Sequence, residues 1–152
     1  MPVAAARYRH VETTIAPALA RGDLLISDRY MASTFVLQRL DGVPMDFLSL
    51  LNAYAPPPDL VVILTATPGT IAGRIARVGV THRFRADPTA PAREVELYRD
   101  TAAFIEGRGT KVLGIDTTEI SPSQVVQRIA DAILTLPLPS KASTTSPTPQ
   151  DT

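Results

Sequence analysis

The stretch "LLISDRYMAST" (residues 24–34) joins a short apolar run to an acid, a base and an aromatic ring. Residues 24–27 are apolar and bounded as a buried strand is, so we expect a strand there. A strand tip holds its last side chains rigidly. Arg29 would then offer a planar guanidinium suited to a phosphate. Asp28 could orient that guanidinium or help to hold a hydrated Mg²⁺. The alternative is a structural Asp–Arg pair at the end of a strand.

The composition limits the classes of protein to consider. The chain has 152 residues and is 45% hydrophobic, which suits one domain with a core. Lys plus Arg and Asp plus Glu both number 15, so no overall field draws in nucleic acid or an acidic membrane. The absence of cysteine excludes disulfides and thiolate metal sites. No apolar run approaches a membrane span, and the first residues lack the apolar core of a signal peptide. We therefore expect a cytoplasmic protein with local anion sites.

Outward from residues 24–34, helical and strand patterns alternate. A helical period covers residues 5–20, where Pro17 should kink or fray the last turn and Gly22 should end the helix. This alternation predicts an α/β fold with a parallel sheet and helices on both faces, whose strand tips form one polar crevice. The other expected elements are strands at 60–64 and 111–115 and helices at 31–40, 45–54, 68–78, 92–106 and from Pro122.

The last residues differ in composition from the rest. Residues 137–152 are rich in Pro, Ser and Thr and have little to bury, so we expect a disordered tail after a single domain at 1–136. Within the domain, Ser121 and Gln124 have the spacing of a capping box. Thr67 is placed to cap the helix that Pro68 begins.

Four segments together resemble the thymidylate kinase family of P-loop nucleoside monophosphate kinases. The most specific is "ARYRHVETTIAPALARGDLLISDRYMASTFVLQ" (6–38), which keeps the family's order of Arg-bearing helix, turn, apolar strand and DRY triplet. The others are "PPPDLVVILTATPGTIAGRI" (56–75), the lid-like "RIARVGVTHRF" (74–84) and "KVLGIDTTEISPSQVVQRIADAI" (111–133). The resemblance covers about residues 4–135.

The resemblance implies a site for an acceptor nucleotide. Arg29 would bind its phosphate, and Asp28 would lie at the centre of phosphoryl transfer. Arg7 matches the arginine that contacts the acceptor base, although the residue taken by itself would be interpreted as a solvated helix residue. The remaining members of the implied pocket are Tyr30, Ser33, Thr34 and Gln38; as an alternative, Ser33 or Thr34 would only cap a helix.

The lid-like stretch implies the donor side of the reaction. Arg74, Arg77 and Arg83 would contact ATP and neutralise charge on the transferring phosphoryl group. The alternative is a mobile basic loop without a ligand. The implied reaction is ATP + dTMP to ADP + dTDP with Mg²⁺, in a possible homodimer. For Asp116, at the end of the last strand, we expect a role in a turn or cap.

The chain departs from the family in lacking a P-loop. No G-x-x-x-x-G-K-[ST] occurs in it, and "GRGTKVLG" (107–114) has the wrong spacing and enters a strand. The family carries this loop upstream, after a strand that lies between those matching 24–27 and 60–64. These two strands must therefore pair anew or leave open edges. We expect either that the natural protein is longer, which we favour, or that a shortened chain needs a partner.

Two smaller departures concern substrate choice. Val3 stands where the family has an aromatic that stacks on thymine, and Leu37 replaces a tyrosine that crowds the ribose 2′ position. The usual lid aspartate is His82. Nucleotide kinase membership is thus a firmer expectation than thymidine specificity. The alternatives are a degenerate, non-catalytic module that binds a nucleotide or a partner, and a non-functional fragment.

Overall fold

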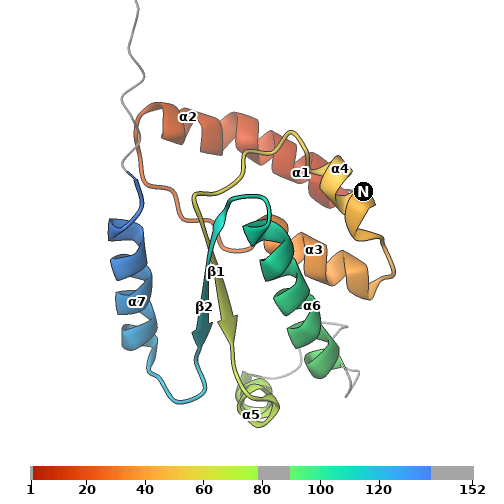
Figure 1. The fold of residues 1–152 in the computed structure, drawn as a ribbon, viewed down its shortest axis with the longest axis vertical. Helices are drawn as coiled ribbons and strands as arrows, with labels where there is room; N and C mark the ends of the chain where they lie inside the picture. The colour runs from red at the N-terminus through yellow and green to blue at the C-terminus, as the bar shows by residue number, and fades with distance from the viewer. Residues whose placement is uncertain (1, 79–89, 138–152) are drawn as a thin grey trace, which may run out of the picture.

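The computed structural model describes residues 2–78 and 90–137, in which two parallel strands lie among helices (Figure 1). Strand β1 (Leu60–Thr65) pairs with β2 (Lys111–Asp116) residue for residue, from Leu60 opposite Lys111 to Thr65 opposite Asp116. In Figure 1, α6 and α7 lie on opposite sides of this sheet. The predicted α/β class with a parallel sheet is confirmed. The helices are α1 (Pro2–His10), η1 (Val11–Ile15), α2 (Ala16–Ala20), α3 (Met31–Leu40), α4 (Met45–Leu51), α5 (Pro68–Val78), α6 (Ala90–Glu106) and α7 (Pro122–Leu134).

The first three helical segments form one continuous rod with a wide turn in its middle. Pro17 has no N–H, and its ring would collide with the carbonyl four residues earlier in a regular α-helix. The π-helix η1 precedes it, and the N–H of Ala16 donates to the carbonyl of Val11, five residues back. A π turn of this kind accommodates the proline without ending the helix. The expected disturbance at Pro17 is therefore present as a π turn.

Gly22 ends the rod as expected. It has φ +79°, a left-handed conformation that glycine adopts without steric cost. Its N–H donates to the carbonyl of Leu19 at 2.9 Å, and the N–H of Asp23 donates to the carbonyl of Ala18 at 3.1 Å. This pair of bonds is a Schellman motif, which satisfies the last helical carbonyls. It directs the chain away from the rod into residues 24–27.

The core lies where three helices meet the sheet. Phe35 of α3, Leu48 of α4 and Ile105 of α6 form its centre, and Val61 and Val112 of the strands pack against them. The rings of Phe35 and Phe104 meet edge to face, with centroids 5.7 Å apart, which favours α3 against α6. The core thus fixes α3, whose first residues carry the predicted site.

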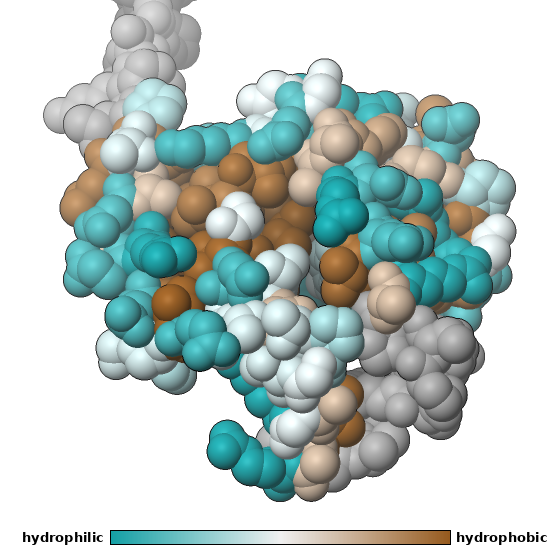
Figure 2. All heavy atoms as spheres, turned by 60° about the horizontal axis from the view of Figure 1, so that its bottom comes forward, coloured by the Kyte–Doolittle hydropathy of each residue, from teal (hydrophilic) through white to brown (hydrophobic). Residues whose placement is uncertain are grey.

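The predicted strand at residues 24–27 is wrong. The segment forms no strand, and Leu24 and Ile26 are 68% and 76% exposed while Leu25 is half-buried. A strand needs a neighbouring backbone for its N–H and C=O groups. Within the described residues β1 pairs with β2 alone, and its Leu64 is 55% exposed. Figure 2 shows a hollow with an apolar floor on this part of the surface. The sheet therefore has an open edge here.

The other predicted helices and strands are present, although some begin or end at different residues. The capping box of Ser121 and Gln124 is formed, with Pro122 opening α7. Thr67 Oγ1 accepts the N–H of Thr70 at 3.4 Å before α5. Helix α4 ends at Leu51 instead of residue 54. Residues 138–152 of the predicted tail lie outside the described residues. No helix in the described ranges has the length and apolar character needed to cross a membrane.

Candidate functional site

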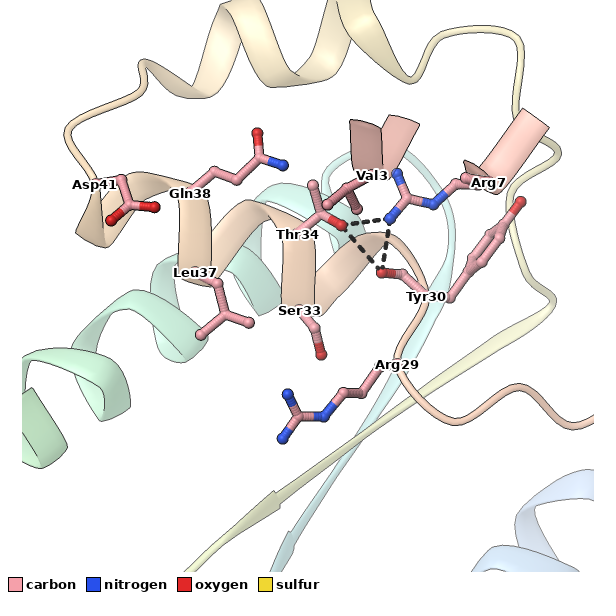
Figure 3. A pocket seen from close by; sticks show the side chains of 9 residues that line it. All are labelled: Val3, Arg7, Arg29, Tyr30, Ser33, Thr34, Leu37, Gln38 and Asp41. Atoms are coloured by element: carbon pink, nitrogen blue, oxygen red, sulfur yellow. Dashed lines mark hydrogen bonds between the residues drawn. The ribbon is translucent and has the colours of Figure 1, made fainter. Parts of the chain in front are cut away.

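A cavity of about 320 Å³ lies beside α1 and along α3, with its lining running from Arg29 before that helix to Asp41 after it (Figure 3). The structure brings together here all six residues that the resemblance assigned to the acceptor pocket. Val3 and Leu37, the two departures from the family that concern substrate choice, line the same cavity. The full lining is Val3, Arg7, Arg29, Tyr30, Ser33, Thr34, Leu37, Gln38 and Asp41.

Arg7 is the buried cation of this cavity. It is only 8% exposed, so the alternative of a solvated helix residue is wrong. Its Nη1 donates to Asn52 Oδ1, and its Nη2 donates to Thr34 Oγ1 and, at 3.2 Å, to the carbonyl of Tyr30. The guanidinium also lies 5.4 Å from the centroid of the Tyr30 ring. These contacts hold the guanidinium between α1, α3 and the end of α4.

The partners of Arg7 are neutral. Neither ion pair seen within residues 2–78 and 90–137 involves it. Desolvation by burial lowers the pKa of Arg7, while burial raises the pKa of Tyr30 beside it. A buried cation without a counter-charge is costly and attracts an electron-rich ligand.

The hydrogen bonds of Arg7 also limit how it can bind. Nη1 and Nη2 both already donate to protein oxygens, while Nε makes no hydrogen bond within the described residues. Neither edge of the guanidinium has both of its nitrogens unused, so no parallel fork is left for a phosphate. Arg7 is suited to a single bond with a carbonyl oxygen.

Arg29 has the opposite character. Its backbone has φ +60°, and no other described non-glycine residue has a positive φ. Such a conformation costs of the order of 1–3 kcal/mol and clusters at functional sites. The side chain is exposed and makes no hydrogen bond or ion pair within the described part of the chain. In Figure 3 it projects to the same side of α3 as Ser33. Arg29 therefore keeps its full set of donors for an oxyanion.

Asp28 is exposed and does not line the cavity. Within the described ranges, no hydrogen bond or ion pair joins it to Arg29, so the predicted orientation of Arg29 by Asp28 is not observed. The same ranges contain no group of three His, Cys, Asp or Glu side chains that could hold a metal ion. Mg²⁺ commonly takes one or two protein carboxylates and completes its shell with water and phosphate oxygens. Asp28 fits such an ion as one ligand only.

The start of α3 orients several lining side chains. No side chain caps this helix, which removes the alternative that Ser33 or Thr34 is only a cap. Ser33 Oγ lies 3.5 Å from the hydroxyl of Tyr98 on α6. Gln38 Oε1 is buried and has no hydrogen-bond partner in the described structure. The side chains of Ser33 and Gln38 both line the cavity.

The predicted donor-side residues lie elsewhere. Arg74 on α5 donates to Thr117 after β2, and Arg77 is exposed; neither lines the cavity. Arg83 and His82 fall outside the described residues. The tips of β1 and β2 meet, since the N–H of Thr117 donates to Thr65. No residue of these tips lines the cavity that contains Arg29, so the expected single crevice of three tips is not formed.

The expected turn role of Asp116 is confirmed. Its Oδ1 accepts the N–H of Thr118 at 2.8 Å, and hydrogen bonds from the side chain and backbone of Thr118 hold the pKa of Asp116 below its usual range.

Sequence reasoning missed Asn52. It follows the last turn of α4, is 3% exposed and accepts a hydrogen bond from Arg7. The one available signal was an amide at the end of an apolar helical pattern. That signal does not reveal a partner 45 positions away.

Comparison with known proteins identifies the family of the chain. The family model described as thymidylate kinase matches residues 2–129. A thymidylate kinase of Xanthomonas oryzae pv. oryzae is 49% identical over 73 residues, which are 48% of this chain and 32% of that protein. A thymidylate kinase of Lactobacillus delbrueckii subsp. bulgaricus is 32% identical over 130 residues, 83% of this chain and 61% of that protein. The chain thus spans less than two thirds of the length of these relatives. The match over most of the chain shows that it belongs to the thymidylate kinase family.

Proposed function

We propose that this chain binds dTMP and supplies the acceptor side of a thymidylate kinase reaction, ATP + dTMP to ADP + dTDP. One observation carries the proposal: a single cavity contains two arginines with complementary donor states. Arg29 has a free guanidinium for the phosphate, and Arg7 retains single donors for a carbonyl oxygen of the base. A pyrimidine mononucleotide has both groups at its two ends.

The chemistry assigned to the chain is positioning and charge neutralisation. Arg29 would hold the acceptor phosphate and offset its negative charge. Asp28 would contribute one carboxylate to a Mg²⁺ carried by the nucleotide phosphates; the metal, when bound, lowers the negative charge at the transferring group. Arg74, Arg77 and Arg83 remain predicted donor-side residues, and a homodimer remains a prediction.

A second candidate is binding without turnover by these 152 residues alone. The observation that favours it is the absence of a G-x-x-x-x-G-K-[ST] motif in their sequence. The acceptor cavity does not depend on that motif. Under this proposal, dTMP binds as in the first candidate, but no dTDP forms in the presence of ATP.

Calorimetry of the purified chain with dTMP tests the binding step. We expect heat of binding that is lost in Arg29→Ala. Arg9→Ala is the matched control, because Arg9 is an exposed arginine of α1 that does not line the cavity. An enzyme-coupled assay for ADP, with ATP and Mg²⁺ added, then separates the two candidates. No heat with dTMP, or equal loss of binding in both variants, would overturn both.

A further inference from the structure

Asn52 makes two hydrogen bonds that fix its side-chain amide in one orientation. Its Nδ2 donates to the carbonyl of Leu48 at 2.6 Å, and its Oδ1 accepts from Arg7 Nη1. A flipped amide would place an NH₂ group against the guanidinium and an oxygen against the carbonyl. Because both flipped contacts repel, Asn52 presents an acceptor to Arg7 in a defined place.

The Oδ1 atom of Asn52 connects the end of α4 to Arg7. Asn52 follows the last turn of α4 and is 3% exposed, and it does not line the cavity. The other two hydrogen-bond partners of Arg7 among the described residues, Thr34 and Tyr30, belong to α3 and to the residue before it. Without Asn52, Arg7 would be held from one side only.

The neutrality of the amide also matters. A carboxylate at this position would pair with Arg7 and cancel its charge inside the cavity wall. An amide oxygen accepts the same hydrogen bond and leaves the positive charge in place. The cavity therefore keeps a preorganised cation for a ligand acceptor.

We infer that Asn52 is a positioning residue: its neutral oxygen fixes the Arg7 guanidinium for the acceptor nucleotide without neutralising it. The inference rests on the proposed function as far as the identity of the ligand is concerned. The hold of Asn52 on Arg7 is a property of the free protein and is measured separately.

A matched control is available in Tyr8, the neighbour of Arg7. Its hydroxyl donates to the carbonyl of Leu51 at 2.9 Å, so it also joins α1 to the end of α4. Tyr8 does not line the cavity, and its hydroxyl makes no hydrogen bond with Arg7 within the described residues. The same hydroxyl accepts the N–H of Tyr54 at 3.4 Å. Tyr8→Phe thus removes both hydrogen bonds between α1 and the end of α4 and leaves the hydrogen-bond partners of Arg7 unchanged.

The first experiment needs no ligand. NMR of the side-chain N–H signals of Arg7 in the full chain reports whether its guanidinium is fixed, with thermal melts as a folding check. We expect slowly exchanging Arg7 signals in the native protein and in Tyr8→Phe, and their loss in Asn52→Ala. Their persistence in Asn52→Ala, or their absence from the native protein, would overturn the inference.

The second experiment measures dTMP affinity by calorimetry. We expect Asn52→Ala to weaken binding by about tenfold or more, the equivalent of one charge-assisted hydrogen bond, while Tyr8→Phe binds as the native chain does. Asn52→Asp should keep the Arg7 signals and still bind dTMP more weakly, because its carboxylate neutralises the cation. Equal losses in Asn52→Ala and Tyr8→Phe would reduce Asn52 to a structural role, and native affinity in Asn52→Asp would overturn the claim about charge. If the native protein binds no dTMP, the proposed function and the claim about charge are both wrong. The NMR experiment uses no ligand, so it still tests whether Asn52 fixes the Arg7 guanidinium.

Discussion

The guanidinium of Arg74 on α5 makes a two-point contact with Thr117, donating to its hydroxyl at 2.9 Å and to its carbonyl at 2.7 Å. Thr117 in turn donates from its backbone N–H at 2.7 Å and from its hydroxyl at 2.9 Å to the carbonyl of Thr65. The three residues therefore join α5 to the ends of β1 and β2. Arg74 has a structural role here that its place in a lid-like sequence did not suggest.

Arg74→Ala should lower the free energy of unfolding by about 0.5–1.5 kcal/mol, since it removes hydrogen bonds that anchor α5. Arg77→Ala is the control: Arg77 is exposed on the same helix and makes no hydrogen bond or ion pair within the described residues, so its loss should change stability by less than about 0.5 kcal/mol. Urea denaturation followed by circular dichroism gives both values. Equal stabilities of the two variants would contradict the anchoring role.

Two substitutions of Arg29 should differ in stability and yet lose dTMP binding alike. At φ +60°, glycine is favoured over any residue with a Cβ, so Arg29→Gly should be about 1 kcal/mol more stable than Arg29→Ala. Both variants should lose dTMP binding, because both remove the guanidinium. Denaturation curves and calorimetry on the same samples test this. A variant Arg29→Gly that is less stable than Arg29→Ala would show that the left-handed backbone is not kept in solution.

Much of the fold follows from local rules, and the residues concerned explain why. The capping box of Ser121 and Gln124 and the cap at Gly22 depend on side chains and backbone within a few positions of one another. Strands β1 and β2 carry short apolar runs. The caps and these runs are encoded in short windows of sequence, whereas the pairing of Leu60 with Lys111 is not.

The strand predicted at residues 24–27 is wrong because strand formation depends on a part of the structure that is distant in sequence. The apolar run is typical of a buried strand, but strand formation requires a neighbouring backbone that no local pattern supplies. The site shows the same division. The family resemblance predicted that Arg7, Arg29 and Thr34 belong to one site, and all three line one cavity. The role of Asn52 was not predicted, because its partner Arg7 is distant in sequence.

The exposure of residues 24–27 leads to a contrast in stability. Ile26 is 76% exposed, so Ile26→Ser should change the free energy of unfolding by less than about 0.5 kcal/mol. Leu48 is fully buried in the core, so Leu48→Ala should cost about 2–5 kcal/mol. Ile26→Ser should also reduce the fluorescence of an added apolar dye, because it removes an exposed apolar side chain. A loss of stability in Ile26→Ser comparable to that in Leu48→Ala would mean that this segment is packed in solution.

Asp116 makes part of the stability depend on pH. Its carboxylate accepts hydrogen bonds from Thr118, which favour the charged form and lower its pKa in the folded protein. For an acid with a depressed folded pKa, the stabilisation is fully present above the unfolded value of about 3.9 and is lost as the pH falls through the folded value. Asp116→Asn should therefore unfold at a lower temperature than the native chain at pH 7, and the difference should shrink below about pH 4. Thermal melts at several pH values measure it, with Glu12→Gln as the control, since Glu12 is an exposed acid that makes no hydrogen bond within the described residues. A difference that stays constant from neutral to acid pH would assign the effect to the amide itself and not to the charge of Asp116.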